Sequence, residues 1–241
     1  MRGVSVTLRL LPRTCPQLAS LVARRVIPDL LTNASGLILV TGATGSGKST
    51  TLAAMVDFLN HHTDGHILTL EDPVEFIYQS ERCLIQQREI GQHSPSFADA
   101  LRSALRQDPD VILLGELRDS ETIRLALTAA ETGHLVLATL HTRGASQAIE
   151  RLVDTFPAQE KDPVRSQLAG SLRAVLAQKL VPDLQDGRVA LYELLVNTAA
   201  AANLIREGKT WQLPGIIQTG QQAGMQNFDQ SLAERRAQGR L

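Results

Sequence analysis

The eight residues GATGSGKS at positions 42–49 constrain this chain more than any other stretch of its sequence. They match the spacing GxxxxGK[ST] and stand directly after an apolar run and directly before a helical pattern. That context is the one a phosphate-binding P-loop requires. The glycines at 42, 45 and 47 let the backbone turn successive N–H groups inward around phosphate oxygens. The alternative is an ordinary glycine-rich turn between a strand and a helix.

The loop predicts a role for its polar side chains. The start of the following helix adds a positive end to the site. Lys48 is expected to neutralise charge on the β- and γ-phosphates, and the Ser49 hydroxyl is expected to hold Mg²⁺. The predicted nucleotide-binding residues are Gly42, Ala43, Thr44, Gly45, Ser46, Gly47, Lys48, Ser49 and Thr50. ATP and Mg²⁺ are therefore the expected ligands.

Short apolar runs alternate with helical patterns along the middle of the chain, which predicts an α/β fold with a mostly parallel sheet covered by helices. The expected strands are 36–41, 66–71, 111–116, 135–140 and 189–195, and the expected helices are 48–60, 97–107, 121–132, 145–154 and 164–180. Ser96 is expected to cap the second helix and Gly133 to end the third. A lone strand within 1–13, a linker with a helix over 14–35 and a small helical appendage over 197–241 complete the prediction.

Hydrolysis of ATP also needs carboxylates from other strands. Glu116 ends the apolar run DVILLGE. An acid at the end of such a strand is expected to reach Mg²⁺ through a water molecule. The alternative is a solvated acid after a buried strand. The segment EDPVE offers Glu71 or Glu75 to orient and deprotonate water beside the γ-phosphate. Its local alternative is a helix start, with Asp72 as N-cap, Pro73 at the first position and Glu75 closing a capping box.

His134 and His141 bracket the run LVLATL. Ligands gather at the carboxyl ends of the strands in such a sheet, so His141 and Thr142 are expected to sense the terminal phosphate. His134 lies at the opposite end, ~20 Å away at ~3.3 Å per residue of a straight strand. A metal site is a weak alternative because no set of further ligands accompanies the two histidines. Four arginines surround the acidic strand and either clamp ATP across subunits or form surface ion pairs: Arg102, Arg106, Arg118 and Arg124.

Composition narrows the function classes. With 24 Lys+Arg against 25 Asp+Glu and only five Phe, two Tyr and one Trp, the chain has neither the charge nor the stacking surface typical of nucleic-acid binding. Cys15 and Cys83 stand too far apart in sequence to suggest a zinc ribbon. No apolar run approaches the ~18 residues of a membrane span, and Arg9 and Arg13 interrupt what would be a signal peptide. A cytoplasmic protein without direct membrane insertion is expected.

Several motifs in the same order resemble those of the ATPases of the type II secretion and type IV pilus superfamily, above all the PilT-like pilus-retraction ATPases. The similar segments are LVTGATGSGKSTTLAAM, HILTLEDPVEF, ALRSALRQDPDVILLGELRDSETIRLALTAAETGHLVLATLHT and NLIREGK. By position, residues 42–49 resemble the Walker A motif and Glu116 the atypical Walker B acid. Glu75 resembles the catalytic glutamate of the aspartate box. His134 and His141 fall on the histidine box.

The resemblance implies a RecA-like P-loop domain over 36–196 and a homo-hexameric ring that hydrolyses ATP in the cytoplasm. It also implies a peripheral position at the inner membrane, where a platform protein of the pilus or secretion system is the partner. The chain has no tetracysteine zinc insertion like that of assembly-type relatives, which favours the retraction branch. The family element AIRNLIRE appears as AAANLIRE, with Ala202 where its first Arg is expected. ATP hydrolysis is therefore better supported than retraction.

The N-terminal end departs most from the family. Residues 1–13 resemble the last strand of the PAS-like N-terminal domain of these ATPases, so the chain is expected to lack most of that domain. In the family the nucleotide lies between the two domains, and neighbouring subunits interlock through them. Slow turnover and poor hexamer formation are therefore expected of this chain alone. The alternative function is a truncated or regulatory ring component that binds nucleotide and hydrolyses it poorly.

Overall fold

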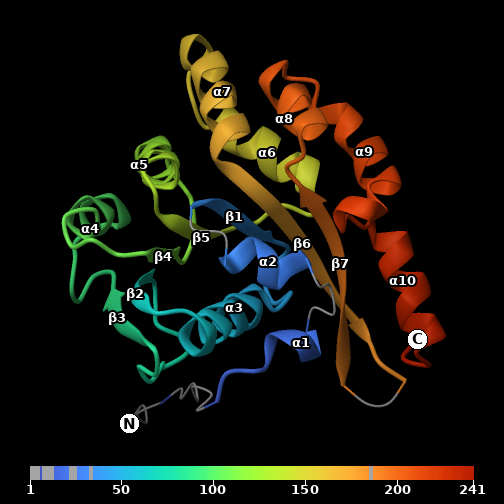
Figure 1. Cartoon of the computed structure of the whole chain (residues 1–241), viewed down its shortest axis with the longest axis horizontal. Coiled ribbons are helices and arrows are strands. Elements are labelled where there is room, and N and C mark those ends of the chain that lie inside the picture. The colour runs from blue at the N-terminus through green and yellow to red at the C-terminus, as the bar shows by residue number, and fades with distance from the viewer. Residues whose placement is uncertain (1–5, 7–13, 22–25, 33–34, 185–186) are drawn as a thin grey trace, which may run out of the picture.

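The computed structural model describes residues 6, 14–21, 26–32, 35–184 and 187–241 (Figure 1). Apart from residue 6, the strand expected within residues 1–13 lies outside the described residues. Two short helices, α1 (Leu18–Leu21) and α2 (Val26–Thr32), occupy the segment for which a linker and a helix are expected.

A single sheet forms the centre of the molecule, and within the described residues it has seven strands in the order β3-β2-β4-β5-β1-β6-β7. All neighbouring strands are parallel except β7, which runs antiparallel to β6. The strands are β1 (Gly36–Thr41), β2 (Gly65–Glu71), β3 (Cys83–Glu89), β4 (Val111–Leu114), β5 (Leu135–Leu140), β6 (Leu172–Pro182) and β7 (Arg188–Val196). The expected mostly parallel α/β fold is confirmed.

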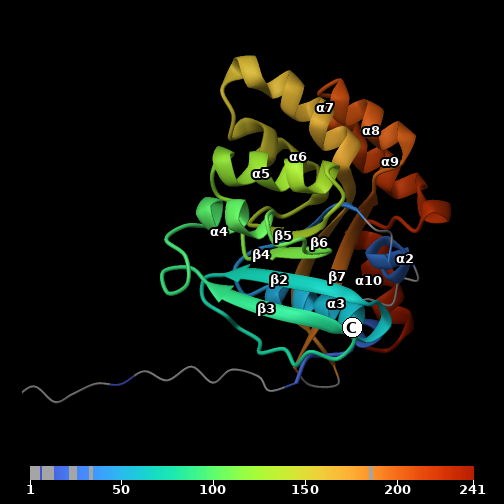
Figure 2. The same ribbon diagram turned by 60° about the vertical axis from the view of Figure 1, so that its left-hand side comes forward.

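Helices cover both faces of the sheet, and the alternating side chains of the central strand β1 explain why. Leu37 and Leu39 join the apolar cluster on one face, whereas Ile38 and Val40 join the cluster on the other. The first cluster includes α4 (Phe97–Ala104), α5 (Ser120–Glu131), α6 (Ala145–Asp154) and α7 (Lys161–Ser171), and the second includes α1, α2 and α3 (Lys48–His62). Figure 2 shows α5 and α6 on one side of the strands and α3 on the other. Every residue of β1 is buried, as a continuous apolar run predicts.

The expected helix over 164–180 is wrong in its second half. Helix α7 ends at Ser171, and the chain continues directly as strand β6 from Leu172 to Pro182. The run LRAVLAQKL has good helix formers, but it lies between β1 and β7, where Ala174–Ala177 is buried. Burial inside the sheet outweighs the local helix preference.

Strand β3 has no counterpart in the sequence prediction. Its side chains are mostly polar and only Cys83 is fully buried, because among the described residues β3 pairs with β2 alone and lies at the edge of the sheet. An edge strand needs no continuous apolar run. The caps that the sequence predicts are confirmed: the Ser96 hydroxyl accepts from Asp99 N at the start of α4, and Gly133, with φ 111°, follows the end of α5.

The C-terminal segment consists of α8 (Ala199–Arg206), α9 (Leu213–Thr219) and α10 (Phe228–Ala237), together with short 3₁₀ turns. Ala201 and Ile205 of α8 and Ile217 of α9 are buried in the same apolar cluster as α5 and α7. Helix α10 packs along β7 at the other end of the sheet from β3 (Figure 1). None of the helices in the described part of the chain combines the length and apolar character that a bilayer crossing needs.

Candidate nucleotide site

The loop after β1 has the backbone that a phosphate cradle needs. Gly45 and Gly47 have φ angles of 76° and 88°, a region that favours glycine. At Gly42 a Cβ atom would come within 2.5 Å of the Gln178 carbonyl oxygen, so a side chain does not fit there. Helix α3 begins at Lys48 with Gly47 as its N-cap and no side-chain cap, which leaves first-turn N–H groups for a ligand.

A side chain from β6 fixes the shape of this loop. The Gln178 amide donates to the Ser46 carbonyl oxygen at 2.6 Å and accepts from the Thr51 hydroxyl at 2.8 Å. Gln178 and Thr51 are both buried. The buried hydroxyl of Ser46, by contrast, has no hydrogen-bond partner among the described residues. The loop is thus braced from the sheet and retains one unsatisfied polar atom.

Lys48 folds back over the loop. Its Nζ donates to the carbonyl oxygens of Gly42 and Ala43 at 2.9 and 3.1 Å, and it lies 3.4 Å from Nδ1 of His141. Burial lowers the pKa of Lys48, while the nearby carboxylates of Glu116 and Glu75 act in the opposite direction. The ammonium group therefore stands between the loop and the acids of the neighbouring strands.

A cleft of about 620 Å³ joins the loop to those acids. Its walls come from the C-terminal ends of β2, β4 and β5 and from the start of α3. The three acids that the sequence predicts line it, namely Glu71, Glu75 and Glu116, and so does one of the two predicted histidines, His141. Among the nine predicted nucleotide-binding residues, the cleft is lined by Thr44, Gly45, Gly47, Lys48, Ser49 and Thr50.

Glu116 follows β4, which ends at Leu114 rather than at residue 116 as expected. The carboxylate is 13% exposed and forms an ion pair with the Arg118 guanidinium. Its other oxygen, Oε2, lies 3.4 Å from Nε2 of His141. Glu116 therefore faces the cleft from the strand next to β5 and contacts the histidine at the end of β5.

Glu71 and Glu75 differ in their surroundings. Glu71 is buried at the end of β2, where it accepts from the Thr69 hydroxyl at 2.6 Å and from the Gln87 amide at 3.2 Å. Burial raises its pKa, and these hydrogen bonds oppose that effect. Glu75 is half-buried in the following segment, residues 72–80, which contains no helix. The interpretation of Asp72, Pro73 and Glu75 as a helix start is therefore wrong.

The two histidines lie at opposite ends of β5, as their spacing predicts. His141 is in the cleft, and the adjacent Thr142 donates its backbone N–H to the Thr41 hydroxyl at 2.9 Å. The His134 ring contacts the Ala129 carbonyl oxygen at 3.0 Å, near the end of α5, and is not among the residues that line the cleft. Within one chain the structure does not bring His134 to the predicted site.

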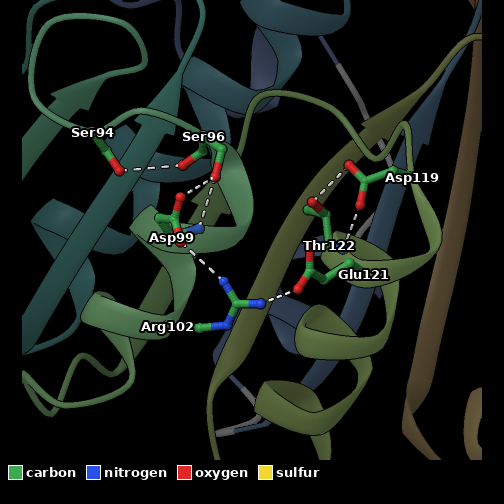
Figure 3. Close-up of polar contacts among 7 residues, drawn as sticks. All are labelled: Ser94, Ser96, Asp99, Arg102, Asp119, Glu121 and Thr122. Carbon is green, nitrogen blue, oxygen red and sulfur yellow. Dashed lines mark hydrogen bonds and ion pairs between the residues drawn. The ribbon is translucent and has the colours of Figure 1, made fainter.

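The four arginines that the sequence singles out lie in different surroundings. Arg118 lines the cleft beside Glu116. Figure 3 shows Arg102 reaching both Asp99 of its own helix and Glu121 of α5, so it links two helices of the same chain. Arg124 forms an ion pair with Glu160 and lies 5.2 Å from the centre of the Phe156 ring. Arg106 is exposed at the end of α4. Surface ion pairs are thus the observed role of Arg102 and Arg124 within the chain.

The sequence interpretation missed the wall of the cleft that β6 and β7 supply. Leu180 and Arg188 line it from the two strands of this hairpin. The Asp-Gly pair at residues 186–187 is a typical hairpin signal, and it would have placed both residues at one end of an antiparallel pair. Tyr78 and Phe76, on the segment after β2, complete the missed lining.

Comparison with known proteins finds a matching family and several similar relatives. The family described as type II/IV secretion system protein matches residues 2–186. YggR of Escherichia coli is 75% identical over 99% of this chain and 73% of its own length. The type IV pilus retraction ATPase PilT of Pseudomonas aeruginosa is 52% identical over 96% of this chain and 67% of its own length.

A crystal structure of the pilus retraction motor PilT with bound ADP superposes with a TM-score of 0.90 and 45% identity, covering 97% of this chain and 66% of that one. The chain thus spans about two thirds to three quarters of the length of these relatives. The match of sequence and fold shows that the chain belongs to the type II/IV secretion system protein family and has the fold of its pilus-retraction ATPases.

Proposed function

We propose that this chain binds ATP with Mg²⁺ and hydrolyses it as a subunit of a ring-forming motor of the pilus-retraction type. The observation that carries the proposal is the meeting of the 42–49 loop with Glu75, Glu116 and His141 in one cleft. Two of the relatives add support, since one is a pilus retraction ATPase and the other is a retraction motor with bound ADP.

Phosphate binding follows from the loop itself. The uncapped first turn of α3 and the glycine backbone at 45 and 47 present N–H groups to an anion. The ammonium of Lys48, which otherwise rests on the carbonyl oxygens of Gly42 and Ala43, moves to the β- and γ-phosphate oxygens. Gln178 keeps the loop in shape because it bonds to Ser46 rather than to the ligand.

The residues present fit Mg²⁺ as a partner of the phosphates. Ser49 in the first turn of α3 and Glu116 beyond β4 both line the cleft and offer the hard oxygen ligands that Mg²⁺ prefers. No group of three or more His, Cys, Asp or Glu side chains able to hold a metal occurs among the described residues, so phosphates and water would have to supply the other ligands of a bound Mg²⁺. When bound, Mg²⁺ neutralises charge that develops on the phosphate oxygens.

We assign the activation of water to Glu75. A general base must lie within hydrogen-bond reach of the proton that it accepts. Glu75 lines the same cleft as Lys48 and the phosphate loop, which supports this assignment. We assign Glu116 to Mg²⁺ instead, because it follows β4 in the place where the sequence predicts the acid for the metal. His141, between Glu116 and Lys48, is assigned to sensing the terminal phosphate.

Partners and location follow from the family. We infer a homo-hexamer that acts at the cytoplasmic side of the inner membrane on a platform protein of a pilus or secretion system. We infer that His134 acts at contacts between subunits, because it lies away from the cleft of its own chain, and that the exposed Arg106 acts there as well. Light scattering of the protein with and without nucleotide tests the ring.

Phosphate release separates the motor from the alternative, a ring component that binds nucleotide without turning it over. The protein is assayed at several concentrations beside a Lys48→Ala variant. Turnover well above that of the variant supports the motor. Nucleotide binding with phosphate release equal to that of Lys48→Ala at every concentration would exclude it for this chain.

A further inference from the structure

The segment that carries Glu75 has no regular structure of its own. Residues 72–80, between β2 and β3, form neither helix nor strand. Such a segment has no backbone ladder to fix its position, so those of its N–H and C=O groups that are shielded from water need partners elsewhere. Several of these partners are side chains of the edge strand β3, which Figure 2 shows beside β2.

Gln87 holds the part of the segment that follows Glu75. Its side-chain oxygen accepts from the backbone N–H of Tyr78 at 3.0 Å. Its side-chain nitrogen donates to the carbonyl oxygen of Phe76 at 2.8 Å and to Glu71 Oε1 at 3.2 Å. The oxygen and the nitrogen of one side-chain amide are therefore both bonded to the segment, and the nitrogen is also bonded to Glu71, the acid that precedes it.

Two further carboxylates hold the residues around Glu75. Glu89 of β3 accepts from the backbone N–H of Val74 at 3.0 Å. Glu71 accepts from the backbone N–H of Glu75 itself. Backbone groups of Val74, Glu75 and Phe76, three consecutive residues, are thus each bonded to a side chain of β2 or β3.

We propose that Gln87 is a positioning residue that holds the carboxylate of Glu75 in the cleft. The proposal rests on the proposed function, in which Glu75 accepts the proton of the attacking water. Proton transfer demands a heavy-atom distance of roughly 2.6–3.2 Å, and a misplacement of about 1 Å costs on the order of a hundredfold in rate. The hydrogen bonds of Gln87 in the described structure go to Glu71, Phe76 and Tyr78 and not to the 42–50 loop, so its loss is expected to affect turnover rather than nucleotide binding.

The neighbouring residue provides a matched control. Side chains alternate along a strand, so Gln86 points to the opposite face from Gln87. Gln86 is exposed and bonds to Nε2 of His66 at 3.2 Å. Substitution by Met keeps the length of the side chain and removes its hydrogen bonds. Gln87→Met and Gln86→Met therefore make the same chemical change on the two faces of one strand.

The first measurement is steady-state ATP turnover by the full chain. We expect Gln87→Met to lower kcat at least tenfold while KM for ATP and affinity for a fluorescent ADP analogue stay within about threefold. Gln86→Met is expected to stay within twofold of the unaltered protein in each value. Equal kcat in Gln87→Met and Gln86→Met overturns the proposal. So does a loss in Gln87→Met that appears only as weaker nucleotide binding.

The second measurement, amide hydrogen exchange, does not depend on turnover. In Gln87→Met the peptides that contain Phe76 and Tyr78 are expected to exchange at least tenfold faster, with β1 and β5 unchanged. Unchanged exchange across residues 72–80 overturns the proposal. Faster exchange throughout the protein would show that Gln87→Met does not fold correctly. In that case Gln87→Glu replaces Gln87→Met, with the same expected results for kcat and exchange. This variant keeps an acceptor for the Tyr78 N–H but cannot donate to Phe76.

The two proposals fail in different ways. If the unaltered protein releases no more phosphate than Lys48→Ala, the proposed function fails and the exchange measurement still decides whether Gln87 fixes the segment. If the unaltered protein hydrolyses ATP and Gln87→Met equals it in kcat and exchange, only the positioning role fails.

Discussion

Nε2 of His141 lies 3.4 Å from Oε2 of Glu116, and this contact joins the ends of two neighbouring strands at the cleft. The other ring nitrogen, Nδ1, lies 3.4 Å from Nζ of Lys48. A single imidazole thus touches the cation of the phosphate loop and the acid proposed to reach Mg²⁺. Because Thr142 is bonded to Thr41 at the end of β1, the histidine is also held against the strand that leads into the loop.

The His141 contact makes a first prediction. His141→Ala removes the imidazole that contacts both Lys48 and Glu116, so we expect ATP turnover to fall by about a hundredfold or more, the scale of losing one well-placed polar group at a reacting centre. Phosphate release measures it. The control is His66→Ala at the opposite end of β2, with an expected change of less than about twofold. Equal turnover in the two variants would show that His141 does not contribute to hydrolysis.

Glu75→Gln tests the general base. The amide keeps the size of the side chain but cannot accept a proton, so turnover should fall by about a hundredfold or more while ATP affinity is retained. Glu81→Gln, an exposed acid near the far end of the same segment, should leave turnover nearly unchanged. Normal turnover by Glu75→Gln would show that another group activates the water, with Glu71 the next acid in the cleft.

Ser49→Ala tests the metal assignment. Loss of the hydroxyl removes one expected Mg²⁺ ligand, so ATP affinity in the presence of Mg²⁺ should weaken about tenfold or more. In EDTA, variant and unaltered protein should bind equally, since the N–H groups of the loop remain. Titration with a fluorescent ATP analogue under both conditions measures the difference, and an equal loss in EDTA would assign Ser49 to the phosphates instead.

Much of this site follows from sequence because its parts are local. The spacing of residues 42–49 and the apolar runs before Glu116 and His141 place these groups at one end of a parallel sheet. The partners that hold them are not local. Gln178 meets Ser46 across 132 positions of sequence, and Gln87 meets Phe76 across a segment without periodicity. No pattern of spacing marks such residues, because their roles exist only once the sheet has formed.

The fold is harder to predict where the local preference of the sequence for a helix or a loop disagrees with its position in the sheet. Residues 172–182 contain an alanine- and leucine-rich run with a good helical pattern, yet they form an inner strand. Residues 83–89 are polar enough to be a loop, yet they form the edge strand that supports Glu75. In both cases pairing with a neighbouring strand decides the structure. For β6 that neighbour is β1, which is distant in sequence.

Burial of Glu71 predicts a pH dependence of stability. Because burial raises its pKa in the folded chain above the ordinary value of 4.5, the folded chain holds this proton more tightly than the unfolded chain. The contribution of Glu71 to stability is therefore most favourable below pH 4.5 and falls as the pH rises through the raised value. In Glu71→Gln this dependence is absent.

Thermal unfolding of Glu71→Gln against the unaltered protein measures this effect. The difference in Tm, variant minus unaltered protein, should become more positive from about pH 4.5 to about pH 7. Glu81→Gln, an exposed acid, serves as the control and should give a difference that is constant with pH. A constant difference for Glu71→Gln as well would mean that hydrogen bonds from Thr69 and Gln87 fully offset burial.

The last prediction concerns the helix that follows Glu116. The Asp119 carboxylate caps α5 by accepting from the backbone N–H of Thr122 at 2.8 Å and from its hydroxyl at 2.9 Å (Figure 3). Asp119→Ala should lower the free energy of unfolding by about 1 kcal/mol, and Asp119→Asn, which retains a capping oxygen, by only a few tenths. Arg102→Ala removes two exposed ion pairs nearby, with Asp99 and Glu121, and each should contribute at most about 1 kcal/mol. Urea unfolding measures all three; equal losses for Asp119→Ala and Asp119→Asn would mean that the charge at the helix start, rather than the hydrogen bond, stabilises α5.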